Sequence, residues 1–220
     1  ADRIGEQKLY DYLVKFGFGA KTGAGLAAES GGLLPHVSDW SVTSFPTIAF
    51  GQGVSVTALQ AAQVYQIVAN DGVRINPTIV AGRVNPLGEF EPNTSQQRKR
   101  VVSADTARKV MAMMESVVSD EGTAPGAAIP GYRVAGKTGT ANRVDDSCGC
   151  YRGYVASFIG VAPADKPRFV VAVALTNPRN GHYGGVLGGP VFKEVMTYAL
   201  QKYRVAPSGT ERPDIPTTWK

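Results

Sequence analysis

The sequence predicts a mixed fold of the α/β (α+β) type, in which an antiparallel sheet is flanked by helices. Two observations favour this class. Helical periodicity marks separate segments in roughly the first 120 residues, and three strand-like segments follow one another in the last third of the chain. The chain has 220 residues, of which 43% are hydrophobic and 19% charged, so it is long enough for one domain with a sizeable core.

The first expected element is a helix that ends at Phe16. Apolar residues recur there at helical spacing, at Leu9, Tyr12, Leu13 and Phe16. Residues 17–56 then read as a long irregular stretch. A loop of this length in a compact domain is usually functional or wraps a surface.

Two more helices are expected in the first half of the chain. One begins after Thr57, where Gln60 completes a capping box, and runs to about residue 70. Ser103 caps the next, whose apolar face extends to Val118. Between these helices we expect one strand and one polar, mobile stretch, at residues 78–84 and 91–100.

Three strands are expected next, at about residues 132–143, 154–163 and 168–176. The second and third are joined by a hairpin-sized turn at residues 164–167. Residues 170–175 are continuously apolar, which predicts a strand in the middle of a sheet that is covered on both faces.

The chain is expected to close with a helix and a tail. Gly189 and Pro190 indicate the start of the helix, because proline is favoured in a first turn. Residues 205–220 contain three prolines and are predicted to form a flexible tail. The folded domain is therefore expected to span residues 1–204.

The most informative motif is Gly136–Thr140, which reads Gly-Lys-Thr-Gly-Thr on the first expected strand. Side chains alternate along a strand, so Thr138 and Thr140 point to the same side. Gly139 leaves the backbone between them open to close approach. The ammonium of Lys137 and the two hydroxyls can hold the carboxylate of an extended peptide bound to this edge.

The same letters have a rival interpretation. Residues 131–138 match the Walker A pattern of nucleotide-binding P-loops. A P-loop needs a strand before its first glycine and a helix after its Lys-Thr, whereas a loop precedes Gly131 and no helical period follows Thr138. This context disfavours a nucleotide binder, and a surface strand without chemistry is the other alternative.

Cys148 and Cys150 are separated by one glycine. Two thiols do not make a zinc site, so no metal is predicted, and no cofactor is expected. A local disulfide, in an oxidising compartment, and two free thiols both stay open. The net charge of +5 is spread along the chain apart from residues 98–100, so nucleic acid is not an expected partner.

Several short motifs occur in a fixed order along the chain. They are Phe16–Gly19, Gly23–Leu26, Glu29–Leu33, Phe50–Gly53, Val134–Thr140, Phe158–Pro163, Pro167–Phe169, Tyr183–Gly185 and Pro190–Phe192. With these motifs the chain resembles the transpeptidase domain of class B penicillin-binding proteins, of the division type. The resemblance implies the penicillin-binding/serine β-lactamase-like transpeptidase fold.

The resemblance also implies an activity, peptidoglycan cross-linking by acyl transfer from D-Ala-D-Ala stem peptides, a reaction that β-lactams trap. Lys137 would assist proton movement, and the Thr140 N–H would stabilise the oxyanion, so these two are the candidate catalytic residues. The Thr138 and Thr140 hydroxyls would bind the substrate carboxylate, with Gly139 against the substrate backbone. A supporting scaffold, for which a simple tight turn is the alternative, is expected at Gly51, Gln52 and Gly53.

Two motifs of this family, S-x-x-K and S-x-N, are absent from the 220 residues. The resemblance places both upstream, with the nucleophilic serine and two further strands. The chain is therefore expected to be the C-terminal portion of the domain, either a piece of a longer protein or one chain of a split protein.

The resemblance further implies a location and partners. It places the protein at the extracytoplasmic face of the bacterial cell membrane, anchored by an upstream segment. The expected partners are the stem peptide, β-lactams, the upstream half of the domain, a membrane glycosyltransferase and division proteins. A β-lactamase, a D,D-carboxypeptidase and a β-lactam sensor of the same superfamily stay open as alternatives.

Overall fold

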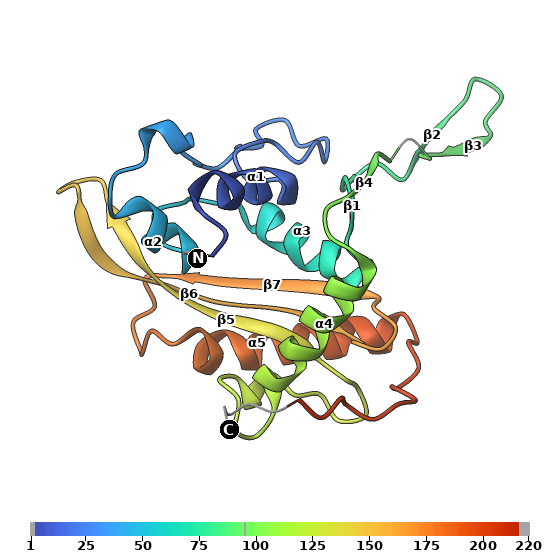
Figure 1. The fold of residues 1–220 in the computed structure, drawn as a ribbon. Helices are drawn as coiled ribbons and strands as arrows, with labels where there is room; N and C mark the ends of the chain where they lie inside the picture. The colour runs from blue at the N-terminus through green and yellow to red at the C-terminus, as the bar shows by residue number, and fades with distance from the viewer. Residues whose placement is uncertain (1–2, 95, 216–220) are drawn as a thin grey trace.

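The computed structural model describes residues 3–94 and 96–215 (Figure 1). The α-helices are α1 (Glu6–Phe16), α2 (Ser44–Ala49), α3 (Ala58–Ala69), α4 (Ala104–Glu115) and α5 (Gly184–Lys202). The strands are β1 (Val73–Ile75), β2 (Gly82–Val84), β3 (Phe90–Pro92), β4 (Arg98–Arg100), β5 (Ala135–Asp145), β6 (Cys150–Ala162) and β7 (Phe169–Thr176). Short 3-10 helices occur at η1 (Val37–Asp39), η2 (Ser116–Val118) and η3 (Pro125–Ala127).

The centre of the molecule is the antiparallel sheet of β5, β6 and β7, in that order. Helix α5 covers one face of this sheet, and α3 and α4 cover the other (Figure 1). Alternation along β6 sends Phe158 toward α5, where its ring meets the Phe192 ring edge-on at 4.9 Å. Val161 faces the other way and packs with Met111 of α4. The sheet therefore separates two apolar layers.

Glycines let α5 lie directly on the sheet. A Cβ atom on Gly184 would overlap the carbonyl oxygens of Ser157 and Gly139. Helix α5 begins at this glycine and not at Gly189, where the helix was expected to start. Pro190 therefore lies inside the helix and cannot donate the usual hydrogen bond to the carbonyl one turn earlier.

The helices predicted from periodicity are confirmed. The capping box of α3 is present, with the Thr57 N–H donating to Gln60 Oε1 and the Gln60 N–H donating to Thr57 Oγ1. The buried Gln60 side chain also donates to the carbonyl oxygens of Ala20 at 2.9 Å and Gly31 at 2.8 Å. This one side chain therefore anchors the irregular stretch that follows α1.

The segment between α3 and α4 differs from the prediction. Only the end of the strand expected at 78–84 forms, as β2, and the stretch expected to be polar and mobile contains β3 and β4. These short strands form because β1 pairs with β4 and β2 pairs with β3. The residues of these strands are mostly polar, so they do not alternate between apolar and polar, and the sequence pattern could not predict the strands.

Strand β7 was predicted to lie in the middle of the sheet, and this is wrong for the described strands, because β6 lies between β5 and β7. Its cover on both faces is confirmed by the contacts of β7 with α3 and α5. A continuous apolar run indicates that both faces of a strand are covered. It does not indicate whether the strand has a hydrogen-bonded neighbour at both of its edges.

The expected flexible tail also differs over its first residues. Ser208 Oγ donates to Asp165 at 2.7 Å and accepts from the Arg133 N–H at 2.9 Å. The Arg133 guanidinium reaches Thr210 Oγ1 at 2.7 Å and forms an ion pair with the buried Glu115. Residues up to Thr210 are thus fastened to the domain, and the end of the predicted tail, residues 216–220, lies outside the described residues.

Candidate active site

The candidate site lies along the outer edge of β5, the edge that faces away from β6. Pairing with β6 is regular from Ala135, opposite Val161, to Asn142, opposite Tyr154. The N–H and C=O of Asn142 bond to a side chain outside the sheet, so they point away from β6. Because the two edges alternate along an antiparallel strand, the main-chain groups of Thr138 and Thr140 face the same outer edge.

Lys137 brings a positive charge to this edge. Its exposed Nζ donates to the main-chain carbonyl of Thr138 at 2.9 Å and lies 3.2 Å from Thr138 Oγ1. Thr138 Oγ1 is in turn 3.2 Å from Thr123 Oγ1. One ammonium and two hydroxyls therefore converge at a single point on the strand edge, an arrangement suited to a carboxylate.

Thr140 shares its side of the sheet with Thr138, as the alternation predicts. Its Oγ1 accepts a hydrogen bond at 3.2 Å from the N–H of Gly184, the first residue of α5. The methyl group of Thr138 lies close to Gly185. Helix α5 thus contacts the side chains of both threonines. The main-chain groups of Thr140 still face the outer edge of β5.

Gly139 has a structural reason to lack a side chain. A Cβ atom there would overlap Ser157 Oγ, which lies directly across the ladder on β6. The sequence predicted that glycine leaves the backbone open to close approach at this position. In the structure, Ser157 of the same domain also requires a residue without a side chain here.

Gln52 lies beside the strand, although 90 residues separate it from its partner. Its Nε2 donates to the Asn142 carbonyl at 3.2 Å, and its Oε1 accepts from the Asn142 N–H at 3.1 Å. Gly51 and Gly53 flank it with φ angles of 93° and 86°, which strongly favour glycine. The two glycines allow the turn after α2 that presents this side chain.

The cysteines lie away from this cluster, at the turn that joins β5 to β6. Cys148 and Cys150 form a disulfide. Asp145 closes the same turn by accepting hydrogen bonds from the side chain and N–H of Ser147, and these lower the pKa of its carboxyl. The disulfide thus belongs to the hairpin tip and does not touch the Lys-Thr-Gly-Thr segment.

The nucleotide-binding alternative does not fit this geometry. Gly136, Lys137 and Thr138 lie within an extended strand that continues to Asp145, and no helix follows them. A phosphate cradle needs a loop that opens into a helix N-terminus.

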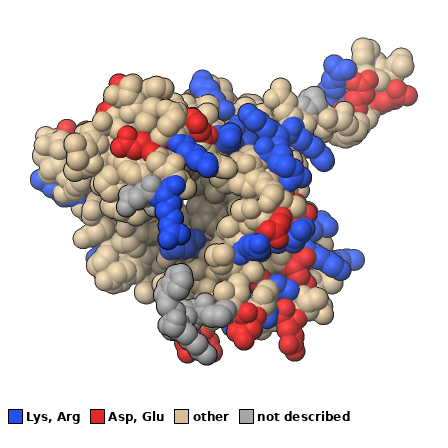
Figure 2. All heavy atoms as spheres, viewed as in Figure 1, with Lys and Arg blue, Asp and Glu red and all other residues tan. Residues whose placement is uncertain are grey.

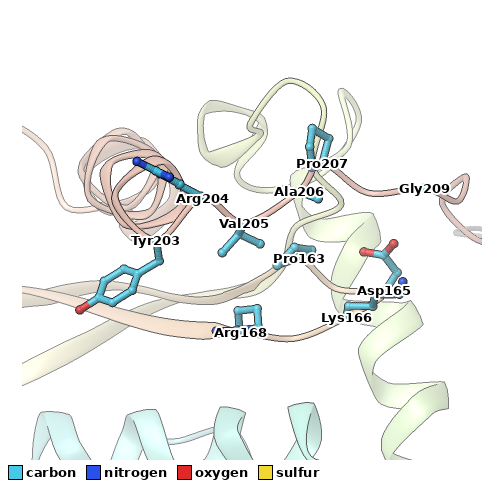
Figure 3. Close-up of a pocket in the computed structure, with 10 residues that line it drawn as sticks. All are labelled: Pro163, Asp165, Lys166, Arg168, Tyr203, Arg204, Val205, Ala206, Pro207 and Gly209. Carbon is cyan, nitrogen blue, oxygen red and sulfur yellow. The ribbon is translucent and has the colours of Figure 1, made fainter.

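One cavity of the structure lies away from the candidate residues. A cavity of about 390 Å³ lies between the β6–β7 turn and the segment after α5 (Figure 3). Its lining residues are Pro163, Asp165, Lys166, Arg168, Tyr203, Arg204, Val205, Ala206, Pro207 and Gly209. None of the candidate site residues lines this cavity.

Two further properties concern the described residues as a whole. No three His, Cys, Asp or Glu side chains in the described ranges gather where a metal ion could be held. None of the described helices combines the length and hydropathy that a membrane span requires.

Sequence reasoning missed Thr123, whose hydroxyl completes the polar cluster. It lies between η2 and η3, in a turn-rich stretch, Gly122 to Gly126, that carries no periodic signal. The available hint was a lone hydroxyl among turn formers shortly before the motif strand. The main chain of Thr123 lies against Gly185 of α5, a contact that no local sequence pattern reveals.

Comparison with known proteins identifies the family. The sequence profile described as the penicillin binding protein transpeptidase domain matches residues 1–197. The chain belongs to the penicillin-binding transpeptidase family. The family and the transpeptidase fold expected from the motifs are thereby confirmed.

Individual relatives agree with this family. The transpeptidase chain is 41% identical to penicillin-binding protein PbpB of Mycolicibacterium smegmatis, over 98% of its own length and 35% of PbpB. It is 37% identical to stage V sporulation protein D of Bacillus subtilis, over 94% of its length and 32% of that protein. The chain thus spans about a third of the length of these curated relatives.

Solved structures extend the likeness to the fold. Penicillin-binding protein 3 of Mycobacterium tuberculosis, complexed with ampicillin, matches 96% of this chain with a TM-score of 0.89 and 40% sequence identity. The match covers 49% of that crystallised chain. The transpeptidase domain of Burkholderia pseudomallei penicillin-binding protein 3 matches with a TM-score of 0.78 and 36% identity.

Proposed function

We propose that this chain supplies the carboxylate-binding half of the active site of a peptidoglycan D,D-transpeptidase that β-lactams inhibit. The observation that carries the proposal is the convergence of Lys137 Nζ, Thr138 Oγ1 and Thr123 Oγ1 at the outer edge of β5. A relative 36% identical to the chain is named a probable peptidoglycan D,D-transpeptidase, PenA of Neisseria flavescens.

In this proposal the stem peptide lies extended along β5. Its terminal carboxylate accepts hydrogen bonds from the Thr138 and Thr140 hydroxyls beside the Lys137 ammonium. The outward N–H of Thr140 donates to the carbonyl oxygen of the scissile bond. Negative charge develops on that oxygen during attack, and removing one such donor typically slows acyl transfer by about 10²–10³.

The reaction proceeds in two balanced steps. A serine from the upstream half attacks the carbonyl carbon of the penultimate D-Ala, and its proton passes to the departing amine of the terminal D-Ala. The amine of a neighbouring stem peptide then attacks the ester carbonyl carbon of the acyl-enzyme, the new amide bond replaces the ester bond, and a proton from the amine returns to the released serine oxygen. Lys137 holds positive charge beside these transfers, which makes it and Thr140 the proposed catalytic residues of this chain.

The proposal assigns the remaining parts to the rest of the protein. The nucleophile with its lysine, the S-x-N motif and two further strands come from the upstream half, which pairs with this chain. An upstream membrane anchor holds the domain at the extracytoplasmic face, where a glycosyltransferase and division proteins are the expected partners. Gly51, Gln52 and Gly53 support the site from outside the sheet.

The experiment is acylation of the complete protein by a fluorescent penicillin, followed by intact-mass analysis. We expect a lasting adduct on the complete protein and none on the 220-residue chain alone. Lys137→Ala in the complete protein should abolish acylation, whereas Lys109→Ala, a matched change at an exposed lysine on α4, should not.

Other results would overturn the proposal. Rapid decay of the adduct would indicate a β-lactamase, and release of D-Ala without cross-linking would indicate a D,D-carboxypeptidase. A lasting adduct without any turnover of stem peptide would indicate a β-lactam sensor. Normal acylation of Lys137→Ala would remove the site assignment itself.

A further inference from the structure

The outer edge of β5 is open at some residues and closed at others. The main-chain groups of Thr138, Thr140 and Asn142 all face this edge, because outward and inward groups alternate along the strand. At Asn142 both groups are taken by the side-chain amide of Gln52. No other described residue hydrogen-bonds to the outward N–H and C=O of Thr140.

The Gln52 amide takes the place of a neighbouring strand. It donates to the Asn142 carbonyl and accepts from the Asn142 N–H, which is the pair of bonds that a residue of an adjacent strand would make. A peptide that adds to β5 therefore cannot extend its ladder to Asn142 while Gln52 is bound there. The remaining edge provides main-chain partners at Thr140, while the Thr138 carbonyl accepts from Lys137 Nζ at 2.9 Å.

Gln52 is itself held firmly. Its N–H donates at 3.0 Å to the carbonyl of Thr47 on α2, and the Gly51 N–H donates at 3.0 Å to the carbonyl of Ile48. Ile48 is buried, so α2 is fixed to the body of the domain. Residues 44–52, which comprise α2 and the turn up to Gln52, thus form a fixed support for β5, here called the brace.

We infer that Gln52 is a positioning residue for acyl transfer. It closes the substrate-binding edge at Asn142 and holds Thr140, two residues away, so that its N–H meets the developing oxyanion. This inference rests on the proposed function. It concerns the position of the Thr140 N–H on β5, and not the ammonium of Lys137 or the hydroxyls of Thr138 and Thr123.

The chain offers a matched control for the chemistry of this brace. Gln66 on α3 likewise donates one bond to the main chain around β1 and accepts one, with its Nε2 donating to the Val73 carbonyl at 3.2 Å and its Oε1 accepting from the Ile75 N–H at 3.2 Å. Gln66→Ala therefore removes two side-chain bonds to a strand outside the site. This variant shows what the loss of two side-chain hydrogen bonds does to stability alone. Any further loss in Gln52→Ala can then be assigned to the position of β5 in the site.

The test measures β-lactam acylation of the complete protein and separates the noncovalent dissociation constant from the acylation rate constant. Gln52→Ala should slow the acylation step about 10- to 100-fold, because small misplacements of a reacting group cost rates of this order. Its dissociation constant should change less than about threefold, because Lys137 and Thr138 stay in place. Gln66→Ala should leave both constants unchanged.

A second variant preserves the size of the side chain. Gln52→Glu still accepts from the Asn142 N–H but sets a carboxylate oxygen against the Asn142 carbonyl, so it should also slow acylation. Normal acylation of both Gln52 variants, or equal losses in Gln52→Ala and Gln66→Ala, would overturn the inference. Lys137→Ala, run in parallel, distinguishes that failure from failure of the proposed function, which would show as normal acylation of this variant.

Discussion

Two antiparallel hairpins of this molecule are built on different principles. The inner part of the β5–β6 hairpin lies between helices, and Phe158 of β6, which packs on Phe192 of α5, has no exposed surface. The β2–β3 hairpin forms an arm, residues 78–93, that projects from the body (Figure 1). On this arm Val84 and Phe90 face each other across the ladder, yet they are 67% and 61% exposed.

Local polar contacts hold the arm instead of a core. The Asn85 side-chain oxygen accepts from the N–H groups of Leu87 and Glu89, and Arg83 pairs with Glu91 at 2.6 Å. Figure 2 shows acidic atoms near the end of the arm and Lys and Arg atoms gathered where it joins the body. The comparison shows that strand pairing alone does not indicate how much a segment contributes to stability.

The largest difference between the two hairpins is expected from matched phenylalanine truncations in the complete protein. Phe158→Ala should lower the free energy of unfolding by about 3–5 kcal/mol, because it opens a cavity in a closed core. Phe90→Ala should lower it by less than about 0.5 kcal/mol, because that ring is mostly in water. Urea unfolding of both variants measures the contrast, and equal losses would refute it.

A smaller contrast is expected from two ion pairs. Glu115 is 1% exposed and its partner Arg133 is 17% exposed, so Glu115→Ala should cost about 3 kcal/mol by removing the ion-pair partner of a largely buried guanidinium. Glu91→Ala breaks the exposed pair on the arm and should cost less than about 1 kcal/mol. A Glu115→Ala variant as stable as Glu91→Ala would show that the buried pair does not support the core.

The smallest expected effect is a pH dependence of stability that comes from Asp165. This carboxyl ties the segment after α5, which lacks a core of its own, to the body of the domain. Burial alone would raise the pKa of Asp165, but hydrogen bonds from Ser208 and Thr210 and the charge of Arg133 lower it overall. The folded protein therefore holds fewer protons on this carboxyl than the unfolded chain does. Its stabilisation is present above about pH 4 and is lost as the pH falls through the lowered pKa.

Thermal unfolding between pH 6 and pH 3 checks this prediction. The melting temperature of the wild-type protein should fall more than that of Asp165→Asn, whose amide oxygen still accepts from Ser208 but does not titrate. Identical losses in the two proteins would show that Asp165 does not contribute to the pH dependence.

Local signals explain which parts of the fold the sequence could predict. The capping box at Thr57, the apolar periods of α1 and α4 and the three strands all depend on residues close together in the chain. Short strands such as β4 could not be predicted, because they exist only through pairing with β1. The start of α5 at Gly184 could not be predicted either, because the need for glycine at this position comes from its contact with the sheet.

The candidate site divides in the same way. The sequence by itself determined that Lys137, Thr138 and Thr140 lie on one strand, with the two threonines on one side, because strand alternation is a property of the local backbone. Only the tertiary structure decided what meets them. Thr138 contacts Thr123, 15 positions away, Thr140 contacts Gly184, 44 positions away, and Gln52 grips the strand across 90 positions. Those contacts depend on the packing of whole helices against the sheet, whose energy is spread over many side chains and is visible in no short stretch of sequence.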